Sequence, residues 1–93
     1  MILSDKQLQE IEEFGNLALP LADVAIILMV PEQELAAAYA EPDSQVKMRY
    51  CAGFLRLKAS LRKSIADSAL QGSNPAQNLM QRYIDEIENK EEL

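Results

Sequence analysis

The side chains best suited to chemistry are six cations between Ser44 and Ala66, a stretch that contains no acid. They are Lys47, Arg49, Arg56, Lys58, Arg62 and Lys63. Several lysines and arginines on one helix could neutralise the phosphates of a nucleic acid. The same cations could instead form salt bridges, because charged side chains also collect along the edges of buried apolar stripes. The candidate acids for such bridges are Glu32, Glu34, Asp85 and Glu86.

The composition argues against catalysis. The chain has no histidine and one cysteine, which excludes histidine-based nucleophilic triads and zinc sites of the cysteine–histidine type. Cys51 is interpreted as a small apolar residue within a helix. Three glycines do not form a phosphate-binding loop, and no carboxylate lies in an apolar setting that would suit acid–base work. We therefore expect a non-enzymatic protein with no cofactor, no metal and no small-molecule substrate.

Size and charge limit the remaining classes. A chain of 93 residues makes one domain of marginal stability, which assembly with other copies would increase. A net charge of −6 argues against a protein that simply coats DNA. The longest apolar run is far shorter than the roughly 20 residues of a membrane span, and no signal peptide is evident. We expect a cytoplasmic protein with no membrane contact.

The periodicity predicts an all-α fold without strands. We expect a helix-turn-helix-like unit of three helices over residues 1–42. A long helix and a C-terminal helix over residues 43–93 would form the oligomerisation region, within one compact domain. Ser4 and Gln7 have capping-box spacing at the start of the first helix, and Gly15-Asn16 is expected to end it. Asn74 is the expected cap of the last helix, after a break at Gly72.

Residues 20–40 have the spacing of a helix-turn-helix motif. The small residue, the turn residue and the aliphatic residue are Ala25, Met29 and Leu35. The turn usually has a glycine, which adopts positive φ readily, so Met29 is a departure. Pro31 could allow a different turn geometry, and a plain helical hairpin with a proline corner remains an alternative.

The helix after this turn is acidic and poorly suited to reading bases. Of its exposed side chains, Gln33 alone is of a type that reads base edges, whereas Glu32 and Glu34 would be repelled by phosphates. The six cations of the long helix are therefore the better candidates for DNA contact.

The long helix carries two apolar stripes on opposite sides at 100° per residue. One stripe is Val46, Tyr50, Phe54, Leu57 and Leu61. The other is Met48, Ala52, Leu55, Ala59, Ala66 and Leu70. The rest of so short a chain can cover one stripe, so we expect a second copy to cover the other. The second stripe is the candidate subunit interface, although the sequence leaves open which stripe faces the other copy.

These features together resemble small terminase subunits and related small DNA-packaging proteins of tailed bacteriophages. The resemblance rests on the helix-turn-helix-like unit, on Tyr50-x-x-Gly53 in the long helix, and on the segment from Ile65 through Gly72-Ser73 to Met80. It implies a homo-oligomer in the host cytoplasm that binds viral double-stranded DNA and presents it to a large ATPase–nuclease subunit. The alternatives are a protein-interaction module that uses the acidic third helix and a small helix-turn-helix transcriptional regulator.

Overall fold

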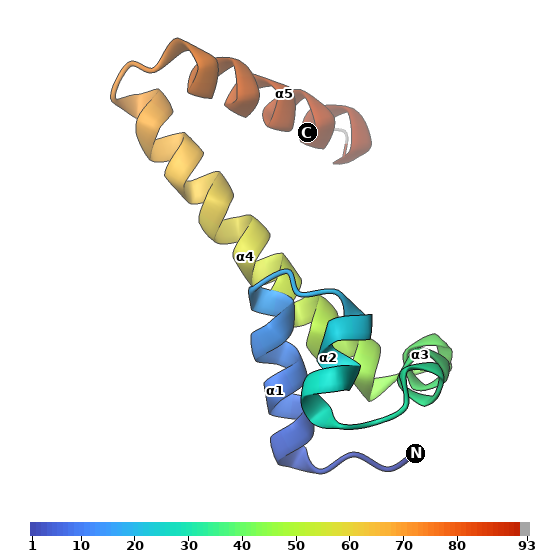
Figure 1. Ribbon diagram of the computed structural model, residues 1–93. Coiled ribbons are helices and arrows are strands. Elements are labelled where there is room, and N and C mark those ends of the chain that lie inside the picture. Colours follow the sequence, from blue (N-terminus) through green and yellow to red (C-terminus); the bar gives the residue numbers. More distant parts are fainter. Residues whose placement is uncertain (92–93) are drawn as a thin grey trace. The chain divides into compact units, whose positions relative to one another are not determined.

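The structure is a computed structural model and describes residues 1–91. Over these residues the protein is all-helical, with five helices and no strands, as expected (Figure 1). The helices are α1 (Asp5–Asn16), α2 (Leu21–Leu28), α3 (Glu32–Ala40), α4 (Gln45–Leu70) and α5 (Asn74–Glu91). Residues 92 and 93, the end of the expected oligomerisation region, lie outside the described residues. The chain forms two compact units, residues 1–57 and the residues from Lys58 onward, so the division falls inside α4.

The start of α1 follows the predicted capping box. The hydroxyl of Ser4 accepts a hydrogen bond from the backbone N–H of Gln7 at 3.1 Å. The side-chain oxygen of Gln7 in turn accepts one from the backbone N–H of Ser4 at 2.9 Å. Two backbone donors at the helix N-terminus are thereby satisfied, which confirms the prediction from the spacing.

α1 ends at Asn16, within the predicted Gly15-Asn16 end, but Gly15 itself lies in the helix and is not the residue that terminates it. Ala18 takes the left-handed conformation at φ 57°. The N–H of Ala18 donates to Gly15 O at 2.9 Å, and that of Leu19 donates to Phe14 O at 3.0 Å. This is the hydrogen-bond pattern of a Schellman motif, usually built on glycine at the left-handed position. An alanine makes the turn here, and Gly15 has another role.

The corner between α2 and α3 is made by Met29 itself. Met29 is left-handed at φ 60° and ψ 40°, so the residue adopts the conformation for which glycine is usually used. The N–H of Val30 donates to Ala25 O at 3.0 Å, which closes the turn. Pro20 and Pro31 directly precede α2 and α3, where a missing N–H costs nothing. The alternative turn geometry that Pro31 suggested is not adopted.

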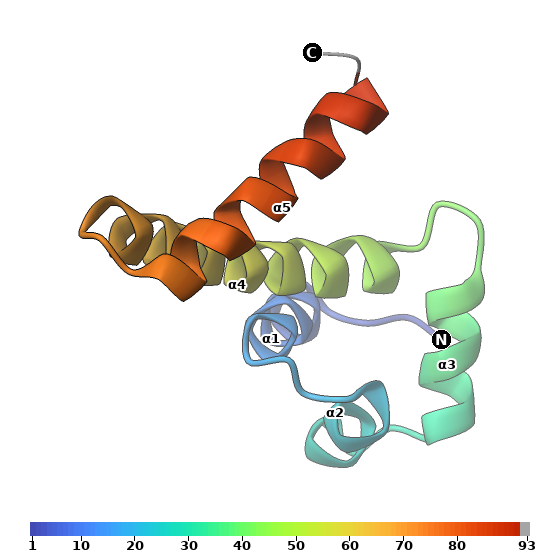
Figure 2. The same ribbon diagram turned by 90° about the horizontal axis from the view of Figure 1, so that it is seen from above.

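The core of the first unit is formed where α1, α2 and α3 meet the first half of α4. Its buried apolar side chains are Ile11, Val24, Ala25, Leu35 and Val46. Figure 2 shows α1 between α2 and the first half of α4. Gly15 and Gly53 permit the close approach of α1 and α4, because a Cβ on Gly15 would collide with the Tyr50 backbone and one on Gly53 with the Glu12 backbone.

Two long-range hydrogen bonds support this contact. The amide of Asn16 donates to the carbonyl oxygen of Gly53 at 3.1 Å. The hydroxyl of Tyr50 donates to the carbonyl oxygen of Leu19 at 2.9 Å. The first bond joins α1 to α4 at the glycine itself, and the second fixes the α1–α2 connection against the same helix.

The second unit consists of the later turns of α4 and the helix α5, joined at Gly72, which is left-handed at φ 102°. Ser73, and not Asn74, caps α5, because the Ser73 hydroxyl accepts a hydrogen bond from Ala76 N at 3.4 Å. The side chain of Gln77 donates to Ala69 O at 3.0 Å across the turn. Ala76 is the one buried residue among those described in this unit.

Candidate nucleic-acid and assembly surfaces

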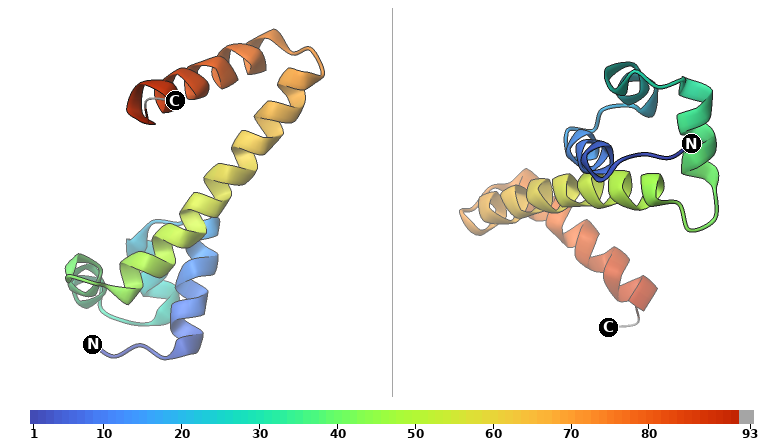
Figure 3. Two further views of the ribbon diagram at one scale, coloured as in Figure 1. Left: turned by 180° about the vertical axis from the view of Figure 1, so that it is seen from behind. Right: turned by 90° about the horizontal axis from the view of Figure 1, so that it is seen from below.

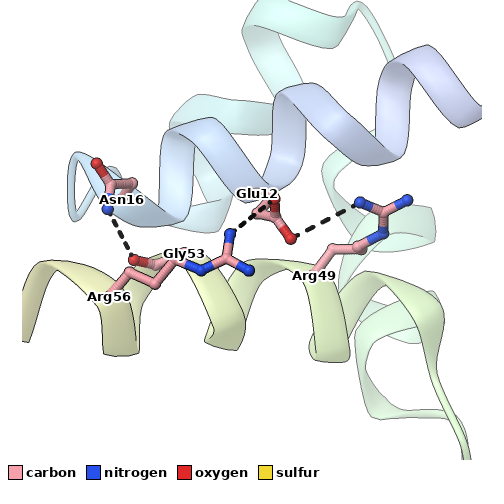
Figure 4. Close-up of polar contacts among 5 residues, drawn as sticks. All are labelled: Glu12, Asn16, Arg49, Gly53 and Arg56. Atoms are coloured by element: carbon pink, nitrogen blue, oxygen red, sulfur yellow. Dashed lines mark hydrogen bonds and ion pairs between the residues drawn. The ribbon is translucent and has the colours of Figure 1, made fainter. Parts of the chain in front are cut away.

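Two of the six cations of α4 bind a single carboxylate on α1. Glu12 lies between Arg49 and Arg56, as Figure 4 shows, with N–O distances of 3.7 Å and 3.1 Å. Glu12 is more buried than either arginine, so the pair of guanidinium groups closes over it. The salt-bridge hypothesis therefore holds for these two residues. The acid is Glu12, however, and none of the four acids named from the sequence forms an ion pair with them within residues 1–91.

Two further cations of α4 lie over aromatic rings. The guanidinium carbon of Arg62 is 4.0 Å from the centroid of the Tyr83 ring, which places this arginine between α4 and α5 of the second unit. The ammonium nitrogen of Lys47 is 6.0 Å from the centroid of the Tyr39 ring, at the edge of the range for such a contact.

Tyr39 lies beside Cys51, with its hydroxyl oxygen 3.5 Å from Sγ. The hydrogen bond to Cys51 raises the pKa of Tyr39 above its ordinary value, and partial burial adds to this effect. The ring also packs edge-on against Tyr50, with centroids 6.1 Å apart. Cys51 thus acts as a half-buried packing residue beside α3, in line with its interpretation from the sequence.

The remaining cations of α4, Lys58 and Lys63, are exposed. Neither forms an ion pair within the part of the chain that the structure describes. Lys47 and Arg62 likewise have no ion pair there, so Lys58 and Lys63 are the two cations of this helix with neither an ion pair nor an aromatic ring within residues 1–91. Gln33 is exposed on α3. Its neighbours Glu32 and Glu34 lie in the first turn of α3, where negative charge interacts favourably with the helix dipole.

The candidate interface stripe of α4 is largely exposed. Met48 and Leu55 are 58% and 57% exposed, and Leu70 is more exposed still. Ala59 is also exposed, whereas Ala52 and Ala66 are half-buried. Within the first unit these side chains face away from α1, because the buried Val46 and Gly53 occupy the opposite side of the helix.

The opposite stripe is covered most completely along its first turns, and Leu57 further along is half-buried. Val46 is buried and Tyr50 is half-buried, but Phe54 and Leu61 are exposed. The expectation that the rest of the chain covers one whole stripe is therefore wrong. The close contact with α1 reaches Gly53 and the ion pair to Arg56, so the apolar positions beyond it lack that cover.

An apolar surface on α2 was missed in the sequence analysis. Ile26 and Met29 are 75% and 90% exposed, and Ile27 is more than half exposed. The signal was available, since a helix of eight residues with apolar side chains at nearly every position cannot turn all of them inward.

A groove in the second unit lies beside α5. It encloses about 430 Å³ and is mostly apolar, with one cation and one acid at its rim. Its lining residues are Arg62, Met80, Tyr83, Ile84, Ile87 and Glu88.

No family model, curated protein or solved structure matches this chain. None of the helices within residues 1–91 is long and apolar enough to cross a membrane. The described residues also contain no cluster of three or more cysteine, aspartate or glutamate side chains that could hold a metal ion.

Proposed function

We propose that the protein is a non-enzymatic homo-oligomer of the small-terminase type. In this proposal it binds double-stranded DNA and presents it to a large ATPase–nuclease partner during viral DNA packaging. The observation that carries the proposal is the surface of α4, where exposed Met48 and Leu55 lie on a helix that has six cations and no acid between Ser44 and Ala66.

The apolar part of this surface supports assembly. Full burial of a leucine or methionine side chain stabilises by roughly 1.5–3 kcal/mol relative to leaving it exposed. Met48 and Leu55 are more than half exposed, so much of this stabilisation is available to a contact with another copy. Phe54 and Leu61 extend the exposed apolar area around the helix.

The charged part supports contact with phosphates. Arg49 and Arg56 are held by Glu12, and Lys47 and Arg62 lie over aromatic rings, so Lys58 and Lys63 are the cations best placed for DNA. Two lysines per copy make a weak site alone, but an oligomer would present several pairs at once, and linked sites bind far more tightly than single ones.

The left-handed Met29 supports the helix-turn-helix part of the proposal. The turn between α2 and α3 has the backbone conformation that the motif uses, although a methionine adopts it. The small Ala25 of α2 and Leu35 of α3 are both buried in the core of the first unit.

The test combines native mass spectrometry with DNA binding measured over a salt series. We expect a discrete oligomer whose logarithmic affinity falls linearly with the logarithm of salt concentration. The double variant Lys58→Gln/Lys63→Gln should reduce that slope by about 2 for each copy that contacts DNA, since each phosphate contact contributes about 0.9. Lys6→Gln, an exposed cation on α1, is the matched control. A monomer, or an oligomer that ignores DNA at low salt, would contradict the proposal.

A protein-interaction module is the second candidate, and one observation favours it. From Gln7 to Val46 there are eight acids and no lysine or arginine, and exposed isoleucines lie in the same segment. Such a surface suits a protein partner better than a nucleic acid. An oligomer without DNA affinity would favour this candidate, whereas a small transcriptional regulator would require binding to one defined operator half-site.

A further inference from the structure

The exposed surface at the α2–α3 turn combines apolar and acidic side chains. We name it the acidic corner and define it as Asp23, Ile26, Ile27, Met29 and Glu32. Asp23 is three and four positions before Ile26 and Ile27, so the three share one side of α2. Buried Val24 and Ala25 occupy the side that faces the core, so the isoleucines face away from it.

The charge around the acidic corner limits what it can bind. No lysine or arginine occurs from Gln7 to Val46, so the segment that forms α2, α3 and most of α1 has acids as its charged groups. This surface repels phosphates and other anions. Its occupant must supply apolar side chains together with positive charge.

The chain itself contains a surface of that chemistry. We name it the basic stripe and define it as Met48, Ala52, Leu55 and Lys58. Lys58 follows Leu55 by three positions and is therefore its neighbour on the same side of α4. The surrounding stretch from Ser44 to Ala66 contains no acid, so nothing on this part of the helix offsets the positive charge.

The apolar part of the basic stripe and the acidic corner lie on opposite sides of the first unit. Figures 2 and 3 show α1 between α2 and the first half of α4. Ile26 points away from α1 on one side, and Leu55 points away from it on the other, two positions beyond the buried Gly53. One copy therefore cannot close these two surfaces on each other, but two copies can.

We infer that the acidic corner of one copy docks on the basic stripe of the next, in a head-to-tail contact. This inference rests on the homo-oligomer proposed above and names its interface. Symmetric pairings are disfavoured, because corner on corner would bring Asp23 and Glu32 against like charges, and stripe on stripe would do the same for Lys58. A head-to-tail contact repeats, and it forms a ring if the rotation between copies closes and a filament if it does not.

Two variants test the contact from its two sides. Met29→Asp places a charge in the acidic corner, at a residue that is 90% exposed and left-handed, a conformation that aspartate tolerates. Leu55→Glu places a charge in the basic stripe, also at an exposed residue. Each alone should weaken assembly at least about tenfold, because Met29→Asp removes the most exposed apolar side chain of the corner and Leu55→Glu sets a carboxylate against Asp23 and Glu32. Ile2→Asp, at a residue 99% exposed and outside both surfaces, is the control and should assemble normally.

Mixing the two variants is the decisive measurement, made by native mass spectrometry with circular dichroism to verify that each is helical. Met29→Asp retains an intact stripe and Leu55→Glu an intact corner. At a protein concentration at which each variant alone is monomeric, the mixture should therefore form heterodimers and nothing larger.

Three results would overturn the inference. A mixture that remains monomeric excludes the head-to-tail contact, and so does a Met29→Asp variant that still assembles like the unmodified protein. In both cases the unmodified protein still forms an oligomer, so the proposed function survives. An unmodified protein that is itself monomeric removes both proposals.

Discussion

The two units of the molecule differ in how completely they bury their own side chains. The first unit excludes Ile11, Val24, Ala25 and Leu35 almost entirely from solvent and brings α1 against α4 through two glycines. In the second unit, Ala76 is the one buried residue among those described, and isoleucines on α5 remain over 40% exposed.

This difference in burial indicates which unit is better able to fold as a single copy. A core with several fully buried aliphatic side chains can stabilise a small unit, whereas two helices that fully bury a single alanine exclude much less apolar surface from water. The first unit therefore has what it needs to fold alone. The second unit leaves more of its apolar side chains exposed, and the predictions below test that contrast.

The largest expected effect comes from shortening one isoleucine in each unit. Ile11→Ala removes a fully buried side chain and should lower the free energy of unfolding by about 3 kcal/mol. Ile87→Ala, at a residue 42% exposed, should lower it by less than about 1 kcal/mol in the monomer. Chemical denaturation at low protein concentration measures both. Equal effects would mean that the two units are equally well packed.

The next effect concerns the glycine contact of the first unit. Gly53→Ala gains up to about 1 kcal/mol of helix propensity, but its Cβ meets the backbone of Glu12, which cannot move aside as a side chain would. We expect a net loss of about 2 kcal/mol, the usual scale of overpacking. Gly72→Ala is the comparison, because its Cβ meets nothing and only the left-handed backbone penalises it, by about 1 kcal/mol. A neutral Gly53→Ala would contradict the close approach of α1 and α4.

Hydrogen exchange should separate the two units by their dependence on concentration. Amides of α1 are expected to exchange at rates that do not change with protein concentration, because the first unit is complete in one copy. Amides of α5 should become at least about tenfold slower when assembly is driven by concentration, if a further contact beyond that of the acidic corner with the basic stripe covers the exposed apolar side of this helix. Mass spectrometry of peptides from α1 and α5 gives the comparison. An α5 that is protected equally at all concentrations would argue for a self-sufficient second unit.

A smaller effect follows from the carboxylate between the two arginines. Glu12→Gln removes both ion pairs and should cost at most about 1 kcal/mol of stability, because the arginines are partly exposed. If the protein binds DNA, the released Arg49 and Arg56 should also increase the affinity at low salt and steepen its salt dependence. Glu13→Gln, an exposed neighbour on α1, is the control and should change neither quantity.

The smallest expected effect is at Tyr39. Its pKa is raised above 10.0, mainly by the hydrogen bond to Cys51, so the neutral form is favoured in the fold. The resulting stability is fully present below the ordinary pKa and is lost as pH rises through the raised value. Cys51→Ala should lower the pKa of Tyr39, followed by the absorbance of the phenolate in an alkaline titration. Tyr39→Phe identifies the signal, and an unchanged titration in Cys51→Ala would exclude the hydrogen bond as its cause.

The local features of the fold could be predicted because each depends on neighbours in sequence. The capping box at Ser4 and Gln7 spans three residues, and the prolines at 20 and 31 each fix one helix start. The left-handed Gly72 follows from the same logic. The starts and the order of these helices can therefore be predicted from short stretches of the sequence.

The errors arose where one residue type serves two purposes. Gly15-Asn16 is where α1 was expected to end and where it does end, but Ala18 takes the left-handed position and the glycine serves the contact with α4. Ser73 and Asn74 are both good caps, and the position of the first helical hydrogen bond decided between them.

Long-range contacts could not be predicted in the same way. Glu12 and Arg56 are 44 positions apart, and nothing in either segment marks one as the partner of the other. Which side chains of α4 are buried depends on where α1 packs against it. That place is marked by Gly15 and Gly53, and the sequence does not indicate that these two glycines lie in one contact. The candidate cations and stripe residues were named correctly as residues of one helix, while their neighbours required the structure.

The uneven charge of the first unit has a consequence for encounters in solution. The charged residues of α2 and α3 are all acids, whereas Arg49 and Arg56 lie on α4, on the other side of α1 from α2, so the charge of this unit is unevenly distributed and gives it an electric dipole. The field orients the protein relative to an approaching polyanion before the two touch, and it orients the protein the opposite way relative to a polycation. Each encounter therefore begins with the molecule already oriented, and low ionic strength makes this steering stronger.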